Sequence, residues 1–305
     1  MKKNVYSKDG YRFIDIEFDN RRDFIDYLKT AKTSLTFWGT ELASMKISVE
    51  RFEFTSTTNF NEALILFENG WYEEFENFLN LKKQVDKLMP YVSLKKRFEN
   101  RVSGFIPNVP NAIRNLPNSM RKTCIVNNGK SINVYVNSSY PWTVKKEQIN
   151  HLGVLTLSLL DFLDSIGYRT NLTTFCISES ANQILYIKND LKKAGDGQNL
   201  QKYYFPFCHP SYLRRLMFRV NETTSELNKS WLSGYGRIID IDRMKEVLKL
   251  DDNVILISNP YEIGIKGENL KDDIQAFLDY ILLGRKLDFD ETFYNIIDNA
   301  KVLRK

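Results

Sequence analysis

The sequence predicts an α/β fold whose sheet is built mainly from the second half of the 305-residue chain. A strand pattern at 131–136 is followed by a helix pattern at 144–166 and by a second strand pattern at 168–177. A strand, a helix and a strand over so short a stretch form a βαβ unit, whose strands are parallel and whose crossover is right-handed. With 43% hydrophobic and 27% charged residues, the chain also has the composition of an ordered globular protein.

Residues 1–122 are predicted to form an α-rich N-terminal region. Helical spacing of Phe24, Tyr27 and Leu28 indicates a first helix after the turn at Asp9-Gly10. An alternating pattern at 46–54 predicts a short strand.

Two further helices are expected before the middle of the chain. One begins near Asn59 or Asn61 and ends at Gly70, and the next covers 78–88. The segment 103–122 holds three of the eight prolines and many asparagines, which is typical of an ordered loop or a domain junction. We therefore expect a second domain over 123–305.

The helix at 144–166 carries apolar side chains off its main stripe, so we expect it to be buried on most sides. The gap between 168–177 and the next strand, 183–188, is short enough to permit only a hairpin. That strand should be antiparallel and lie at the sheet edge. Helices at 211–220, 240–250 and 268–284 and a central strand at 254–258 complete the predicted domain.

Composition excludes several classes of protein. The longest apolar run, Leu152 to Leu163, is shorter than the roughly 20 residues that cross a bilayer. The N-terminus lacks the apolar region of a secretory signal, so we expect a cytoplasmic protein without a membrane partner. Three cysteines without a CxxC pair argue against a disulfide framework, and only two histidines accompany them. We expect neither a metal nor a cofactor.

The net charge of +5 is mild, and the basic runs that could form a patch are Lys82 to Lys87, Lys95 to Arg97, Arg114 to Lys122 and Arg214-Arg215. Nucleic-acid-binding proteins concentrate basic residues in a patch, whereas solvated helix faces produce similar runs. The residues that would serve a nucleic-acid-binding site are Lys95, Lys96, Arg97, Arg114, Arg121 and Lys122.

The strand order and the segment 137-NSSYP-141 resemble von Willebrand factor A-like domains. In that family the first strand ends in Asp-x-Ser-x-Ser, whose oxygens hold a divalent metal with help from a later Thr and Asp. Here Asn137 occupies the Asp position, Ser139 matches, and Pro141 replaces the last Ser. Because a hard cation needs several oxygens and usually a carboxylate, the resemblance implies a domain that has lost its metal. Asp251 and Asp252 precede a strand instead of following one, which departs further from the family.

A broader resemblance links the chain to a family of uncharacterised bacteriophage proteins. It is carried by 54-FTSTTNFNEALILFENGW-71, 104-GFIPNVPNAIRNLPNSMRK-122, 164-DSIGYRTNL-172 and 209-HPSYLRRLMFRVNE-222. These blocks span most of residues 50 to 225. The resemblance implies a phage origin and a place in the host cytoplasm, and it implies no established activity.

Motifs of catalysis are weak or missing. The pair Cys208-His209 could supply a nucleophile and a base, but adjacent residues on regular structure point apart, and packing explains them better. No GxxxxGK[ST] or GxGxxG follows a predicted strand. We expect no catalytic residue.

We therefore expect a non-enzymatic protein that binds a host or phage protein, for host takeover or anti-defence. The contact surface should lie at the carboxyl ends of the strands, where open α/β sheets present their loops. Its residues would be Asn137, Ser138, Ser139, Tyr140, Trp142, Thr173 and Thr174. A nucleic-acid-binding protein or nuclease and a virion component are the alternatives. The oligomeric state is left open.

Overall fold

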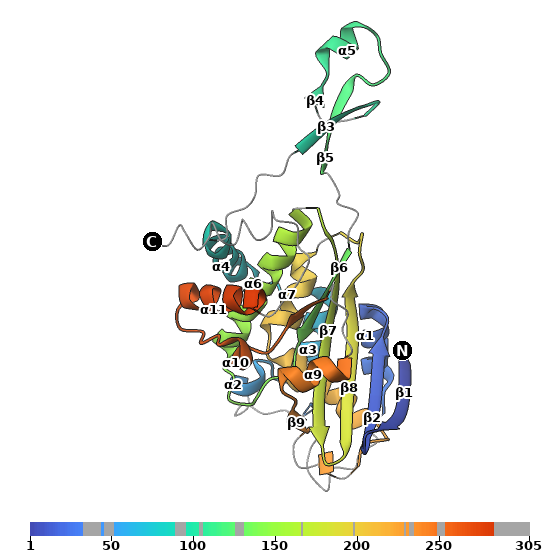
Figure 1. Ribbon diagram of the computed structural model, residues 1–305, viewed down its shortest axis with the longest axis vertical. Helices are drawn as coiled ribbons and strands as arrows, with labels where there is room; N and C mark the ends of the chain where they lie inside the picture. The colour runs from blue at the N-terminus through green and yellow to red at the C-terminus, as the bar shows by residue number, and fades with distance from the viewer. Residues whose placement is uncertain are drawn as a thin grey trace.

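The computed structural model describes residues 1–32, 44–45, 52–88, 96–103, 106–125, 131–165, 167–197, 199–228, 230–231, 235–248 and 254–283. These residues form a body built on a seven-stranded sheet and a smaller unit with a three-stranded sheet. The smaller unit stands apart from the body, beyond the end of the sheet at which β6 begins (Figure 1). The chain is thus a mixed α/β protein with a projecting part.

The strand order of the large sheet is β1-β2-β8-β7-β6-β10, with β9 paired to β7. Strands β6 (Ser131–Asn137), β7 (Arg169–Ser180) and β10 (Val254–Ile257) run parallel to one another. Strand β8 (Gln183–Lys192) runs antiparallel to β7. On its outer side β8 pairs in parallel with β2 (Tyr11–Phe18), which in turn pairs antiparallel with β1 (Lys2–Lys8).

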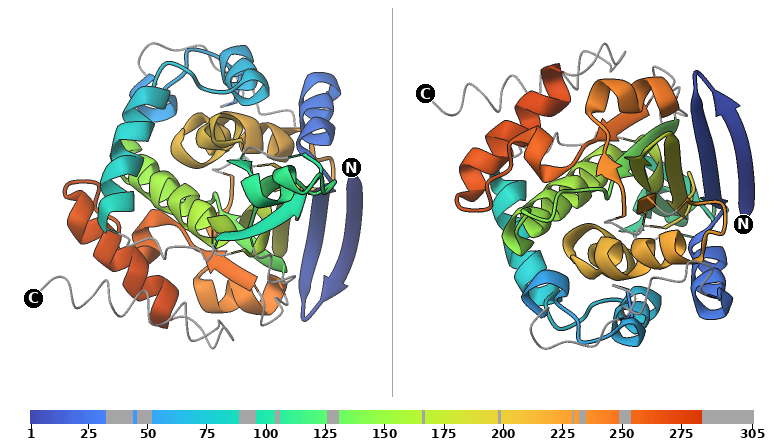
Figure 2. Two further views of the ribbon diagram at one scale, coloured as in Figure 1. Left: turned by 90° about the horizontal axis from the view of Figure 1, so that it is seen from above. Right: turned by 90° about the horizontal axis from the view of Figure 1, so that it is seen from below.

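Helices cover one face of this sheet around α6 (Lys146–Ser165). Side chains of α6 pack against alternate residues of β6, such as Val134 and Val136, in one large apolar core. The same core includes residues from α1 (Arg21–Thr30), α3 (Phe60–Asn69), α4 (Phe75–Leu88), α7 (Leu200–Cys208) and α11 (Leu270–Leu283). Figure 2 shows the β1–β2 hairpin at one end of the sheet and α11 on the opposite side of the body.

The other sheet face carries a smaller apolar cluster under α9 (Ile241–Leu248). Phe175 and Ile177 of β7 and Leu256 of β10 belong to it, together with Met244 of the helix. Because side chains of a strand alternate between faces, Cys176 points instead into the larger core. The two faces of β7 are therefore both buried around the middle of the strand.

The predicted βαβ unit is confirmed: β6 and β7 are parallel and joined by α6, and β8 follows as an antiparallel hairpin strand. The placement of β8 at the sheet edge is wrong, because β2 pairs along its outer side from Arg12 to Phe18. The expected central strand at 254–258 is β10, which ends the described strand order although all four of its residues are buried.

The N-terminal region differs from the α-rich expectation, because its first 18 residues form β1 and β2. Those strands join the sheet of the second half, and the main core contains residues from both sides of residue 122. The expected helices are present as α1, α3 with its cap at Asn59, and α4. Of the expected strand at 46–54, residues 46–51 lie outside the described part, and α2 (Phe52–Thr55) occupies the remainder.

The segment after β8 brings several short elements to the end of the sheet. Helix α7 leads into η1 (Tyr212–Met217), a stretch of π-helix, and then into α8 (Phe218–Thr223). Strand β9 (Arg237–Ile238) pairs with Ser178 and Glu179 at the carboxyl end of β7. Helix α10 (Pro260–Ile263) follows β10. Among the described residues, no helix is long and apolar enough to cross a membrane.

The projecting unit, residues 96–125, is called the arm below. It consists of β3 (Lys96–Arg101), β4 (Ile106–Pro107), α5 (Val109–Ile113) and β5 (Met120–Ile125). Strand β5 pairs antiparallel with both β3 and β4. Most of the segment expected to be a loop or junction, 103–122, is therefore ordered structure of the arm.

Candidate functional site

The loop that leaves β6 is held by its own polar side chains. Asn137 Oδ1 accepts a hydrogen bond from Ser139 N at 2.8 Å, which turns the chain just after the strand. Ser138 donates to Phe175 O twice, from its backbone N at 2.8 Å and from its Oγ at 2.7 Å. The polar residues of 137-NSSYP-141 thus fasten the loop to β7.

Ser139 bridges a gap in the sheet. Strand β6 pairs with β7 as far as Phe175, and β9 pairs with β7 from Ser178, which leaves Cys176 and Ile177 between them. Ser139 Oγ accepts from Ile177 N at 2.8 Å and donates to Ile177 O at 3.1 Å. The hydroxyl therefore takes the place of a neighbouring strand at this position.

The two threonines that were expected at the same site point to other partners. Thr173 Oγ1 donates to Asp190 Oδ1 at 2.7 Å. Thr174 Oγ1 lies 2.7 Å from Tyr212 OH, which also accepts from Asn189 Nδ2. The threonines therefore do not converge with Ser139, and the described residues contain no group of three or more His, Cys, Asp or Glu that could hold a metal.

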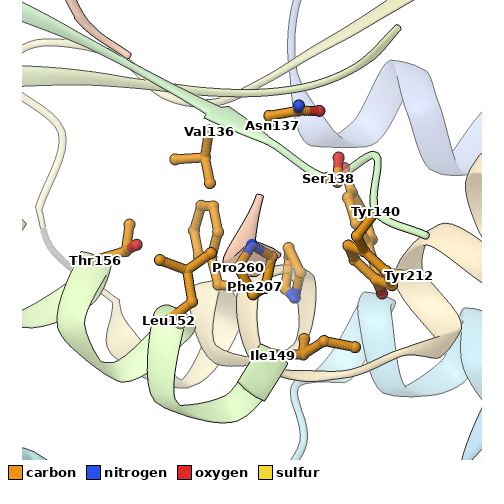
Figure 3. Close-up of a pocket in the computed structure, with 12 residues that line it drawn as sticks. Val136, Asn137, Ser138, Tyr140, Ile149, Leu152, Thr156, Phe207, Tyr212 and Pro260 are labelled. Carbon is orange, nitrogen blue, oxygen red and sulfur yellow. The ribbon is translucent and has the colours of Figure 1, made fainter. Parts of the chain in front are cut away.

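Five of the seven expected binding residues, Asn137 to Ser139 and both threonines, are buried. A cavity of only about 20 Å³ lies beside Asn137 and Ser138, and its volume suits one water molecule at most. Figure 3 shows Val136, Leu152 and Phe207 pointing toward one another between β6 and the helices that cover it. The immediate end of β6 is therefore filled.

A larger opening begins at the other two residues, Tyr140 and Trp142. This groove has a volume of about 380 Å³, which lies within the range of ordinary ligand sites. The loop after β6, the end of β7, η1, α8 and the segment around β9 form its walls. It is lined by Phe54, Ser139, Tyr140, Pro141, Trp142, Cys176, Ser178, Leu213, Arg214, Phe218, Asn221, Tyr235, Gly236, Arg237 and Ile238.

Arg214 of η1 contacts residues from several segments that form the groove. Its guanidinium donates to Phe54 O and, at 3.0 Å, to Val144 O. The same group lies 3.8 Å from the centre of the Phe54 ring and 5.4 Å from that of Tyr140. Burial lowers the pKa of Arg214. Since its N–H donors point to backbone carbonyls, we infer that this arginine stabilises the wall of the groove rather than binding an anion.

A second rigid wall is aromatic. The rings of Phe218 and Tyr235 stack with centres 3.9 Å apart and planes 3° from parallel. Tyr235 OH donates to Glu222 Oε1 at 2.6 Å, and Glu222 is fully buried. Trp142 lies on the loop after β6 and also lines the groove. It is 80% exposed, which makes it the most exposed large hydrophobic residue of the described chain. An exposed tryptophan beside fixed rings is typical of a contact surface.

Two polar atoms of the groove lining have no hydrogen-bond partner. They are Ser178 Oγ and Asn221 Oδ1, and their residues are only 5% and 3% exposed. A buried polar group without a partner costs roughly 1–3 kcal/mol. A water molecule, or a ligand atom that reaches these two atoms, would supply the missing partner.

The titratable side chains in the groove's described lining are those of one cysteine, two tyrosines and two arginines. Its described lining contains no histidine, aspartate or glutamate. Burial raises the pKa of the Cys176 thiol to about 11, so this cysteine is protonated at neutral pH. Elsewhere, burial raises the pKa of Cys208 and lowers that of His209 to about 3. The His209 ring packs against the rings of Trp71 and Phe205, in agreement with the expected packing role of this residue.

The groove continues into an open depression of about 770 Å³ that shares Gly236, Arg237 and Ile238 with it. Charges of both signs line the depression, and Arg243 lies 3.4 Å from Glu179. The two hollows adjoin at these residues and are together called the trough below; the first has an aromatic wall and the second carries charges of both signs. That arrangement suits an extended chain more than a compact small molecule.

The expected nucleic-acid-binding residues lie elsewhere, on the arm. Arg114 and Arg121 are exposed there, and Lys96, Arg97 and Lys122 lie on its strands. Lys95 lies outside the described residues, as do Asp251 and Asp252. The arm lies beyond the end of the sheet at which β6 begins, whereas β9, which contributes to the groove lining, lies toward the opposite end (Figure 1).

Sequence reasoning located the end of β6 and missed the wall formed by residues 213–221 and 235–238. The signal in the sequence was the block 209–222, which contains Arg214 and Asn221. The block carries the resemblance to phage proteins, but nothing in its local spacing shows that it folds back onto the loop after β6.

Comparisons with known proteins identify a family for the chain, but they assign no activity to it. The sequence model of the family described as Domain of unknown function (DUF7192) matches residues 5–283. Neither the curated proteins nor the solved structures contain a match to the chain. The match covers the β1–β2 hairpin, the arm and the groove alike.

Proposed function

The chain belongs to the family described as Domain of unknown function (DUF7192), and we propose that it is a non-enzymatic protein that binds an extended peptide segment of a partner protein. The binding site is the groove between the loop after β6, the end of β7 and α8. This proposal keeps the expected contact surface at the strand ends and moves its centre from Asn137 to the groove that begins at Tyr140 and Trp142.

The observation that carries the proposal is the exposed Trp142 in the lining of a groove that also contains the stacked rings of Phe218 and Tyr235. An amide oxygen accepts hydrogen bonds only, so Asn221 Oδ1 needs a donor such as an N–H group. An extended peptide offers backbone N–H groups at regular spacing and side chains that fit apolar pockets. The aromatic wall of Phe218 and Tyr235 with exposed Trp142 supplies the apolar contact.

Charge favours a peptide over a nucleic acid at this site. The groove's described lining has two arginines, and the guanidinium of Arg214 already donates to two backbone carbonyls. The depression beyond it combines Arg237 and Arg243 with Glu179 and Asp240. A phosphate backbone requires a basic track, which this trough lacks.

The resemblance to bacteriophage proteins supports a partner inside an infected cell. We place the protein in the host cytoplasm, acting on a host or phage protein complex in takeover or anti-defence. The absence of an acid–base pair in the described lining of the groove supports a role in binding rather than in catalysis.

We further propose that the body is a von Willebrand factor A-like domain with an added β1–β2 hairpin. The order β6, α6, β7 and antiparallel β8, with β10 beside β6, supports this assignment. Ser139 Oγ is engaged by Ile177, so no metal should bind at the metal position of that family. Adding Mg²⁺ or Mn²⁺ should leave the unfolding midpoint unchanged, whereas a rise that saturates with metal would contradict this.

The groove is tested by selection from a displayed library of random peptides against the full chain. Selected peptides should share one apolar and aromatic pattern, and Trp142→Ala should weaken a selected synthetic peptide at least about 10-fold, as loss of an aromatic anchor does. Tyr261→Ala is the matched control, because Tyr261 is 74% exposed and lies outside the groove lining. Equal effects of the two variants, or no enrichment, would contradict the proposal.

Ser178→Ala separates binding from stability. Because the hydroxyl has no partner in the free protein, the variant should be as stable as the wild type or more stable by about 1 kcal/mol. The same variant should bind the selected peptide less tightly. A loss of stability with unchanged affinity would show that Ser178 has a structural role and no ligand.

A further inference from the structure

The arm has a separate chemical character that the groove does not explain. Within residues 96–125 the basic side chains are Lys96, Arg97, Arg101, Arg114, Arg121 and Lys122, and the one acidic residue is Glu99. The arm's net charge is therefore +5, equal to that of the whole chain. The remainder of the protein is neutral overall, so the excess is concentrated in one projecting unit.

The arm also exposes apolar side chains. Ile113 and Val102 are 78% and 74% exposed, and Ile106, Val109 and Leu116 are each at least 45% exposed. Thus five of the large hydrophobic residues that the described chain exposes lie within 15 positions of one another. Clustered exposed apolar residues mark a contact surface more often than single ones do.

Hydrogen bonds fix the shape of the arm despite this exposure. Asn108 is buried, donates from Nδ2 to Asn100 Oδ1 at 2.9 Å, and receives Ala112 N at its carbonyl. Asn111 Nδ2 donates to Asn118 O at 3.0 Å. These bonds join β3, α5 and the chain before β5, so the arm has a defined shape before it meets a partner.

We propose that the arm binds duplex DNA, with its basic residues on the phosphates and its apolar tip in a groove. A concentrated positive charge is complementary to a polyanion. Aliphatic side chains such as those exposed on the arm can contact thymine methyl groups in the major groove or wedge between base steps. The exposed amides of Asn115 and Asn118 add donors and acceptors that base edges can use.

An anionic membrane would attract the same charge, but the arm's composition fits it less well. Residues 96–125 contain five asparagines and no tryptophan or tyrosine, the residues that favour a membrane interface. Asparagine side chains at an inserting tip would lose water without gaining partners. The asparagines that lie among the apolar residues of the tip therefore favour DNA over a membrane.

The experiment measures binding of the full chain to a labelled mixed-sequence DNA duplex at several salt concentrations. The test variant is Arg101→Gln/Arg114→Gln/Arg121→Gln, which changes three exposed residues of the arm. The matched control, Arg22→Gln/Lys202→Gln/Lys245→Gln, removes the same charge from exposed positions of the body. Circular dichroism of both variants checks that they fold.

For the wild type the logarithm of affinity should fall linearly with the logarithm of salt concentration. The arm variant should bind at least about 10-fold more weakly at about 0.1 M salt, with a slope shallower by about 2–3, because each lost phosphate contact removes about one counterion. The control should change neither value by a comparable amount. Ile113→Ser should weaken binding and leave the salt slope unchanged, because Ile113 carries no charge.

Absence of binding at about 50 mM salt, or equal losses in the arm variant and the control, would overturn the proposal. So would binding of phosphatidylserine vesicles that depends on the arm while DNA binding does not. Trp142→Ala should leave DNA binding unchanged. The result at the arm is therefore independent of the result at the peptide groove.

Discussion

Replacement of Ser139 by alanine should destabilise the protein more than its small change in volume suggests. The hydroxyl is the acceptor for Ile177 N at 2.8 Å and the donor to Ile177 O at 3.1 Å, in the gap between β6 and β9. Alanine would leave a buried backbone N–H without an acceptor, which costs about 1–3 kcal/mol, and would remove a second hydrogen bond worth about 1 kcal/mol. We expect the free energy of unfolding to fall by about 2–4 kcal/mol.

Ser138→Ala is the matched control for this prediction. Ser138 is also buried, and its hydroxyl donates to Phe175 O, but that carbonyl keeps a 2.8 Å hydrogen bond from Ser138 N. The control should therefore cost about 1 kcal/mol or less. Urea denaturation of both variants gives the comparison. If Ser139→Ala is no more harmful than Ser138→Ala, the bridging role assigned to Ser139 is wrong.

Other parts of the structure give further predictions. Gly153→Ala should destabilise the protein by about 1–3 kcal/mol, exceeding the gain of about 1 kcal/mol in helix propensity, because a Cβ there would lie 2.2 Å from Cys208 Sγ and 2.6 Å from Phe207 O. Gly197→Ala, with no atom within 4 Å of the new Cβ, should be nearly neutral in the same denaturation assay, and equal effects would refute the close packing of α6 on α7. Burial, with smaller effects of Asp240 and Asp242, raises the pKa of Glu262 from 4.5 to about 7. The folded state therefore binds the Glu262 proton more tightly than the unfolded state does. This binding stabilises the fold fully below pH 4.5, and the stabilisation should be lost as the pH rises to about 7. We expect the free energy of unfolding to fall by about 1–3 kcal/mol over that range. Glu262→Gln should lose this part of the pH dependence, and an identical profile for the two proteins would contradict the assignment.

The sequence was most informative for elements whose buried residues repeat at a regular spacing. The leucine-rich α6 and its flanking strands could be predicted because their apolar residues repeat at helical or strand spacing within one segment. Strand β1 could not, because all seven of its residues are exposed and leave no pattern of alternation. The error at β8 has the same origin, since its outer partner β2 comes from residues 11–18, far away in the chain.

The site shows a similar division between local and distant information. The end of β6 follows from the strand pattern, and Tyr140 and Trp142 lie within five residues of it. The polar side chains of Asn137, Ser138 and Ser139 gave a misleading signal, because their hydrogen bonds serve the sheet. The facing wall depends on α8 and β9 returning to the end of β7, which is a tertiary contact that residue spacing does not encode.

The emission of Trp142 in the presence of a selected peptide tests the groove most directly. Trp142 is 80% exposed, and its signal is obtained as the difference between the wild type and Trp142→Phe. Burial of the indole under a bound peptide should shift that emission to shorter wavelength and saturate with the binding curve. Unchanged Trp142 emission at saturating peptide would place the peptide elsewhere and contradict the central claim.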